Sequence, residues 1–121
     1  MEKKIRLRKK EDFSRVYNRG ISAYNNDFKI IGRKNETEDN RYGFSISKKF
    51  GKAVERNFTK RRLKEIIRTN ENEFLKGFDF IIIPRNSVKD LGFDELKKSL
   101  FHCVNNWNKR NSLKRTWKSK K

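Results

Sequence analysis

The sequence has only one cysteine, one proline and one histidine among its 121 residues. Because Cys103 has no partner in the chain, an intrachain disulfide is excluded and a reducing, cytoplasmic location is expected. With His102 as the only histidine, there is no cluster of metal ligands, and a glycine-rich phosphate loop is also missing. The polypeptide therefore shows no self-sufficient active site.

Long apolar runs are absent as well. No stretch approaches the roughly 20 apolar residues that a membrane-spanning helix requires. The first residues, MEKKIRLRKKEDF, are basic but are not followed by the apolar core of a secretory signal. We therefore expect neither a spanning helix nor a secretion signal.

Acidic residues are few: 15 Asp and Glu stand against 33 Lys and Arg, for a formal net charge of +18. Hydrophobic residues make up 33% of the chain, below the roughly 45–50% of an average domain, so the core should be thin. A small domain with this charge repels itself, and a polyanionic partner offsets that cost. Nucleic acid is the leading candidate, and an anionic membrane surface is the rival.

Apolar periodicity predicts the elements of the first half of the chain. Residues 28–31 form a strand, and the polar cluster NETEDN at 35–40 is interpreted as a hairpin connection. A short helix precedes them, with one stripe made of Phe13, Val16 and Tyr17. The segment RYGFSISK, after the turn, alternates between two faces of a strand, with Tyr42, Phe44 and Ile46 on one and Ser45 and Ser47 on the other.

The second half predicts a helix, a strand and a last helix. Phe78–Pro84 is a continuous apolar run, typical of a central strand buried on both faces. In the last helix, His102 falls opposite the apolar stripe and should be exposed, whereas Cys103 lies at its edge as a small buried residue. That stripe consists of Phe93, Leu96, Leu100, Val104 and Trp107. A hairpin followed by strand–helix–strand predicts a small α/β sandwich, with helices packed on a sheet.

The charge is densest in KKFGKAVERNFTKRRLKEIIR, Lys48 to Arg68. At about 100° per residue, Leu63, Ile66 and Ile67 share one side of a helix with Thr59. Glu55 and Glu65 fall elsewhere, so we expect them not to neutralise the basic flank beside this stripe. The flank comprises Asn57, Lys60, Arg61, Lys64 and Arg68.

A solvated lysine-rich face is the plain alternative for such a charge run. Two details favour nucleic-acid binding. Arginine is mixed with lysine, and guanidinium groups match phosphate geometry. Asn57 adds an amide among the cations, which suits sugar or base edges.

The block SISKKFGKAVERNFTKRRLKE, Ser45 to Glu65, resembles the signature of the protein component of bacterial ribonuclease P. The resemblance covers nearly the whole chain, since EDFSRVYNRG, FDFIIIPR and DELKKSL also resemble segments of that family. The matching residues of the signature are Ser47, Lys48, Lys49, Gly51, Ala53, Val54, Arg56, Asn57, Lys60 and Arg61.

The resemblance implies an α+β fold: a small two-layer sandwich with about three helices, a mixed sheet of roughly four strands and an unusual left-handed β-α-β crossover. It also implies one RNA-binding domain over 1–110, with a basic N-terminal arm, and a basic, flexible tail over 111–121. The expected location is the cytoplasm, with no membrane role and no required protein partner.

The function implied is that of an assisting subunit. In the family, a catalytic RNA cleaves the 5′ leader from precursor tRNA, using Mg²⁺ that the RNA holds, while the protein binds both RNAs. The residues implied for the catalytic RNA are Lys52, Arg56, Asn57, Lys60, Arg61, Lys64 and Arg68. The residues implied for a cleft that holds the single-stranded leader are Phe13, Tyr17, Ser45, Ser47, Lys48 and Lys49.

Three positions depart from the family pattern. Phe58 stands where relatives usually carry a basic residue, and it either stacks on a base or covers neighbouring structure. Lys64 keeps a charge where arginine is usual, and Ile31 stands where an aromatic is frequent. Phe13 and Val16 have a core role as their alternative. For the whole chain, the alternatives are a ribosomal-type RNA-binding protein and a basic membrane-surface protein.

Overall fold

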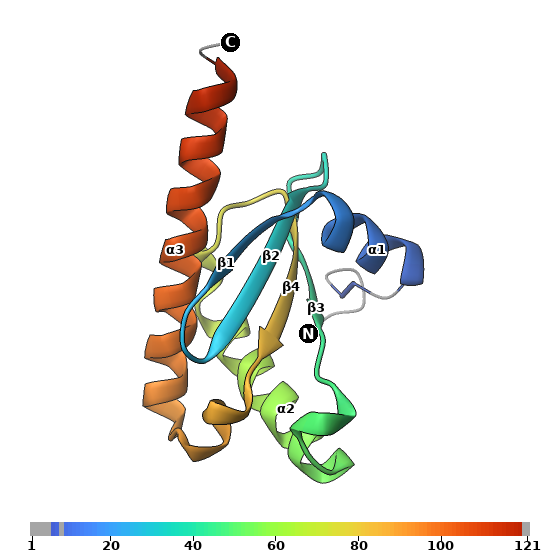
Figure 1. The fold of residues 1–121 in the computed structure, drawn as a ribbon, viewed down its shortest axis with the longest axis vertical. Helices are drawn as coiled ribbons and strands as arrows, with labels where there is room; N and C mark the ends of the chain where they lie inside the picture. The colour runs from blue at the N-terminus through green and yellow to red at the C-terminus, as the bar shows by residue number, and fades with distance from the viewer. Residues whose placement is uncertain (1–5, 8, 120–121) are drawn as a thin grey trace.

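The structure is a computed structural model that describes residues 6–7 and 9–119, with side chains as far as Leu113. Over this range three helices and four strands follow one another along the chain (Figure 1). Their bounds are α1 Lys10–Arg19, β1 Ile21–Tyr24, β2 Phe28–Lys34, β3 Arg41–Phe44, α2 Ala53–Thr69, β4 Phe78–Pro84 and α3 Phe93–Ser119. Short 3₁₀ turns include η2 Lys48–Phe50 and η4 Asn86–Asp90.

The described strands form one mixed sheet in the order β1-β2-β4-β3. The predicted hairpin through residues 35–40 is wrong, because β4 lies between β2 and β3. The apolar run of β4 predicted a central strand, but the pattern within one strand does not reveal which strands pair with its two edges. The real hairpin joins β2 to β1, which the sequence reasoning missed. It turns at Asn25, whose Oδ1 accepts from the N–H groups of Asp27 (3.0 Å) and Phe28 (2.7 Å).

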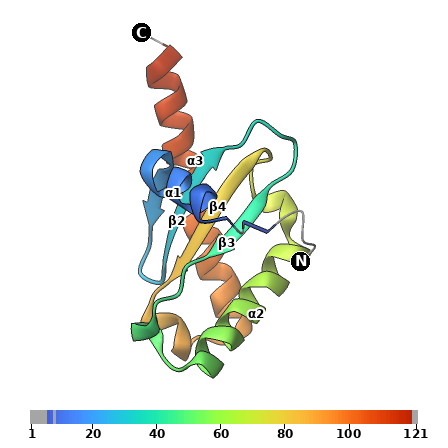
Figure 2. The ribbon, with the colours of Figure 1, turned by 90° about the vertical axis from the view of Figure 1, so that its right-hand side faces the viewer.

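The connection from β3 through α2 to β4 is a crossover between parallel strands. In Figure 1 both strands run downward and β4 lies to the left of β3. Figure 2, turned by 90°, shows α2 to the right of the sheet, which is the side behind the sheet in Figure 1. This path is left-handed, as expected, whereas about 98% of such crossovers are right-handed. The crossover brings the basic helix directly after the edge strand β3.

The main core lies between the sheet and helices α2 and α3. The predicted stripe of α2 is confirmed, since Thr59, Leu63, Ile66 and Ile67 are all buried. Most of the predicted α3 stripe is buried too, from Leu96 to Trp107, but Phe93 at the helix start is exposed. The Trp107 ring packs edge-on against Phe80, and its Nε1–H donates to the Ile21 carbonyl over 2.8 Å.

Helix α1 covers part of the other face of the sheet (Figure 2). Its Val16 is fully buried in a smaller cluster with Ile31, Ile81 and Leu7, and Phe13 packs against the edge of this cluster. Leu7 belongs to the expected N-terminal arm, yet its N–H donates to the Tyr42 carbonyl over 3.0 Å, so this part of the arm docks on β3. Residues 1–5 and 8 of the arm lie outside the described residues.

A charged network ties α1 to the sheet. Arg41 on β3 donates to both carboxylate oxygens of Asp79 on β4, from Nε over 2.9 Å and from Nη2 over 2.6 Å. Its Nη1 also lies 3.4 Å from Asp12 on α1. The hydrogen bond to Asp79 raises the pKa of Arg41, so the guanidinium stays charged between two buried carboxylates.

The last helix is longer than expected. Residues 111–119, anticipated as a tail without regular structure, continue α3 as far as Ser119. Figures 1 and 2 show this end of α3 projecting past the sheet. Asn111 is its last buried side chain among those described, with 4% of its surface exposed.

Candidate nucleic-acid interface

A hydrogen bond between neighbouring residues caps the start of the basic helix α2. The Lys52 N–H donates to Oε1 of Glu55 over 3.2 Å, which satisfies one of the free amide groups at the helix start. This hydrogen bond lowers the pKa of Glu55, and the Lys89 ammonium, 3.6 Å from the carboxylate, lowers it further. Glu55 is therefore engaged at the helix start, away from the predicted flank.

The predicted flank lies beside the buried stripe of α2, as its spacing required. Asn57, Arg61 and Arg68 are exposed, and Lys60 and Lys64 are partly covered. Of the other two residues predicted to contact the catalytic RNA, Lys52 is exposed and Arg56 is partly covered. Partial burial lowers the pKa of Lys64, and the positive charges of Arg6 and Lys60 lower it further. The flank is thus a crowded positive surface, and an anion placed against it would relieve the repulsion.

One expectation about the flank is wrong. Glu65 does neutralise part of it, because the Arg68 Nη2 and Nε groups reach back to its carboxylate over 2.6 and 3.1 Å. The two residues are three positions apart, a spacing at which flexible side chains meet on a helix. This pair lies at the C-terminal end of the helix and leaves the charges around Lys60 unpaired by Glu65.

Arg62, on the same helix, was missed by the sequence reasoning. Its Nη1 donates to the Leu91 carbonyl over 3.0 Å, and its Nη2 lies 3.4 Å from the Val88 carbonyl. It therefore joins α2 to the segment before α3 instead of facing solvent. Only the fold brings these carbonyls near, so no local pattern could have found the contact.

The predicted cleft residues lie on two connected stretches. Phe13 of α1 rests on the sheet against Gly43 of β3, and its side chain is partly exposed. Ser45 follows on the same face two residues later, held beside β4 by an N–H bond to the Ile82 carbonyl (3.1 Å). Tyr17, one turn after Phe13, is 44% exposed. Ser47, Lys48 and Lys49 form the exposed turn that leads into α2.

Burial separates a core role from a cleft role for the apolar residues of α1. Val16 is core, whereas Phe13 both packs on the sheet and keeps an accessible part. Ile31 is 2% exposed beneath α1, so it offers no platform for a base.

The sheet beside α1 continues this surface with residues that the sequence reasoning missed. Tyr24, Lys29 and Ile83 lie side by side in register on β1, β2 and β4. Tyr24 is exposed, and the Lys29 ammonium lies 5.3 Å from the centre of its ring. The signal was the alternation of β2, in which Lys29 and Ile31 share a face opposite Phe28 and Ile30.

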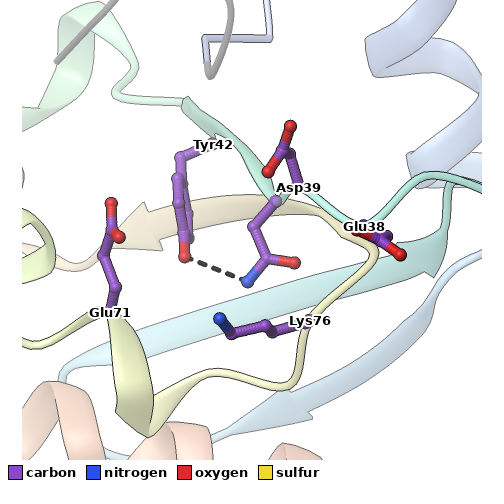
Figure 3. A pocket seen from close by; sticks show the side chains of 6 residues that line it. Glu38, Asp39, Tyr42, Glu71 and Lys76 are labelled. Atoms are coloured by element: carbon purple, nitrogen blue, oxygen red, sulfur yellow. Dashed lines mark hydrogen bonds between the residues drawn. The ribbon is translucent and has the colours of Figure 1, made fainter.

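A small hollow of about 80 Å³ lies at the other end of β3 (Figure 3). Its lining carries three carboxylates against one lysine, and Asn40 Nδ2 donates to the Tyr42 hydroxyl over 3.1 Å within it. Such a lining repels phosphate, so this hollow is not part of the basic interface. The residues that line it are Glu38, Asp39, Asn40, Tyr42, Glu71 and Lys76.

Cys103 and His102 occupy consecutive positions of α3 and differ in exposure. Cys103 is fully buried, and burial raises the pKa of its thiol to about 12. His102 is exposed as predicted, with Nδ1 3.2 Å from the Asn25 side-chain amide. Among the described residues, no three His, Cys, Asp or Glu side chains gather as metal ligands. Nor does any helix in that part of the chain have the length and apolarity to cross a membrane.

The fold and this surface define a small, basic α+β RNA-binding domain. A sequence profile of the family described as Ribonuclease P matches residues 1–108. The chain belongs to the ribonuclease P protein family, as the resemblance of its basic helix indicated. This match favours the ribonuclease P interpretation over the ribosomal one.

Individual relatives agree with the profile. The chain is 44% identical over 102 residues to the ribonuclease P protein component of Finegoldia magna, covering 84% of this chain and 89% of that protein. It is 36% identical over 104 residues to that of Streptococcus pneumoniae, covering 86% and 85%.

Solved structures show the same fold. The RNase P protein from Thermotoga maritima superposes with a TM-score of 0.77 at 35% identity, covering 82% of this chain and 94% of that one. The Staphylococcus aureus RNase P protein gives a TM-score of 0.77 at 35% identity, with 84% and 93% covered.

Proposed function

We propose that this chain is the protein subunit of ribonuclease P and assists a catalytic RNA in removing the 5′ leader of precursor tRNA. The observation that carries the proposal is the placement of two surfaces around the edge strand β3. The crowded positive flank of α2 lies on one side of β3, and α1 with its partly exposed Phe13 lies on the other (Figure 2). One protein edge is thereby able to hold two RNA segments next to each other.

In this proposal the flank of α2 binds the catalytic RNA. Its cations are held at fixed spacing by the buried stripe beneath them, so little ordering is needed on binding. Each phosphate that they neutralise releases condensed counterions, which makes the affinity high and dependent on salt. The residues assigned to this contact are Lys52, Arg56, Asn57, Lys60, Arg61 and Lys64, with Arg68 at the border, where Glu65 weakens it.

The cleft beside α1 holds the single-stranded leader in the same proposal. A single strand without a fixed sequence is bound by aromatic platforms together with a positive groove. Phe13 and Tyr17 supply the platforms, Ser45 and Ser47 supply hydroxyl groups, and Lys48 and Lys49 supply the charge. Lys29 and Tyr24 extend this surface along the sheet.

The cleavage itself is assigned to the RNA, together with the Mg²⁺ ions that it holds. The described side chains do not fit a metal centre, because no group of carboxylates, histidine and cysteine converges among them. The protein contributes binding and orientation of the two RNAs.

The test compares two sets of variants in binding and cleavage assays. We expect Arg56→Ala and Lys60→Ala to weaken assembly with the catalytic RNA. We expect Phe13→Ala and Tyr17→Ala to weaken binding of precursor tRNA to the assembled enzyme, by about 1–3 kcal/mol for each lost stacking contact, and to leave mature tRNA binding unchanged. Equal weakening of both ligands by both sets would contradict the two-surface arrangement.

A reconstitution assay tests the function as a whole. Added to a bacterial ribonuclease P RNA at low Mg²⁺, the wild-type chain is expected to stimulate leader removal from precursor tRNA. No stimulation would reject the subunit role and leave a general RNA-binding protein, and a series of leader lengths would show how far the cleft reaches.

A further inference from the structure

Phe58 is an exposed aromatic residue on the basic helix α2. Its side chain keeps 54% of its surface accessible, although α2 packs well along its other side. Val54, one turn earlier, is 77% exposed. An exposed ring on a helix otherwise lined by charge leaves apolar area in water, and it needs an explanation beyond core packing.

Arg62 of the same helix already covers one part of the Phe58 ring. The guanidinium carbon of Arg62 lies 5.0 Å from the ring centre, the distance of a cation–π contact. Arg62 is itself held by the Leu91 and Val88 carbonyls. Its Nε is buried without a hydrogen-bond partner among the described residues.

This backing gives the ring a preferred orientation. A side chain that is already ordered loses less entropy when a ligand binds than a freely rotating one does. Because Arg62 bonds within the protein, it occupies the ring without offering its charge to a partner. The accessible area of the ring is therefore a pre-oriented apolar platform.

The neighbours of Phe58 indicate the chemistry of what lies on the platform. Arg61 is exposed three residues after Phe58 and so projects from the same side of the helix. A planar base over the ring would place its phosphate within the field of Arg61 and the flank. An apolar protein segment would instead have to desolvate these cations, which is costly.

We propose that Phe58 is a stacking site for one unpaired nucleobase of the catalytic RNA. The inference rests on the proposed function, because the RNA is the ligand of that same helix. It assigns Phe58 a contact that contributes affinity without neutralising a phosphate.

Salt dependence separates stacking from charge. We expect Phe58→Ala and Phe58→Leu to weaken binding of the ribonuclease P RNA roughly 5- to 100-fold, with the slope of affinity against salt unchanged. Phe58→Trp should bind at least as tightly as wild type. As the matched control, Arg61→Ala should reduce the magnitude of the salt slope by about 1, since it removes one phosphate contact.

A spectroscopic readout tests the contact directly. The fluorescence that Phe58→Trp adds to the protein should be quenched on binding RNA, because a stacked base quenches indole emission. Urea unfolding of each variant checks whether the loss of the Arg62 contact unfolds the helix instead. Binding by Phe58→Leu at the wild-type level, or a weakening fully explained by unfolding, would overturn the inference in favour of a purely covering role.

The two proposals fail in different ways. Absence of wild-type binding to the RNA would reject the subunit function itself. Normal wild-type binding that Lys60→Ala weakens and Phe58→Ala does not would reject only the stacking site.

Discussion

The ring of Phe13 lies directly against Gly43: a Cβ atom built on Gly43 would be 2.6 Å from Cζ of Phe13 and 3.1 Å from Cβ of Leu7. The first of these distances is shorter than the nonbonded contacts that Cβ atoms make in proteins. The absence of a side chain on β3 therefore sets how deeply α1 and the N-terminal segment rest on the sheet, and with it the position of the aromatic platform.

Substituting Gly43 with alanine should move that platform. We expect Gly43→Ala to push the Phe13 ring outward, to cost about 1–3 kcal/mol of stability through overpacking, and to weaken leader binding. Urea unfolding and affinity for precursor tRNAs of different leader lengths measure the two effects. The control is Gly92→Ala, where the added Cβ would be 3.6 Å from Glu95 Oε1, an ordinary contact. Equal behaviour of the two variants would contradict the role of Gly43.

Removing Arg41 should destabilise the attachment of α1. Arg41→Ala leaves the carboxylates of Asp12 and Asp79 buried without their shared cation. We expect a loss of about 3 kcal/mol, at the low end for a broken buried pair because the Arg41 side chain is 33% exposed. Arg68→Ala is the matched control, since its pair with Glu65 is exposed and screened by solvent and should contribute little to stability. Similar unfolding midpoints for both variants would show that the network contributes little.

Alkaline pH should weaken the fold through Cys103. Burial raises the pKa of its thiol from 9.0 to about 12, so the folded protein keeps its proton where the unfolded chain loses it. The stabilising contribution is complete below pH 9 and is lost as the pH rises toward 12. Cys103→Ala should reduce the fall in unfolding free energy measured between those pH values. Tyr42, whose pKa burial raises from 10.0 to about 12, should leave a residual slope.

The same burial predicts the reactivity of the thiol. In the folded protein, alkylation of Cys103 at mildly alkaline pH should be slow and should accelerate with urea in step with unfolding. Rapid alkylation of the folded chain would contradict a buried, protonated thiol.

The projecting end of α3 should be dispensable for folding and useful for RNA. Residues 113–121, LKRTWKSKK, follow the last described buried side chain and carry five Lys or Arg residues. A chain ending at Ser112 should keep its stability within about 0.5 kcal/mol, as for other changes away from the core. Its RNA affinity should depend less steeply on salt.

Fluorescence provides the stability measurement for this shortened chain. The truncation removes Trp117 and leaves the buried Trp107 as the only tryptophan, which should report one cooperative transition. A loss of several kcal/mol would show that the end of α3 belongs to the folded core.

Local periodicity by itself predicted the parts of the molecule that a single element decides. Helical spacing predicted the buried stripe around Leu63 and Ile66, the burial of Cys103 and the exposure of His102. This is possible because the spacing of apolar residues along an amphipathic helix shows which face is buried. The family signature on the same helix then identified the class of partner. Helical spacing also placed the basic flank beside this stripe, although it did not predict the pairing of Arg68 with Glu65.

The tertiary structure decided what depends on residues far apart in the chain. No local pattern predicts the insertion of β4 between β2 and β3. The same is true of the packing of Phe13 on Gly43 and of the hydrogen bonds from Arg41 to Asp79, because each contact joins distant segments. The orientation of Phe58 belongs to this group, since the carbonyls that hold Arg62 come from a segment near residue 90. Sequence periodicity determined which face α2 and most of α3 bury. Long-range packing determined which faces meet, because contact energies depend on the neighbours that the folded chain brings together.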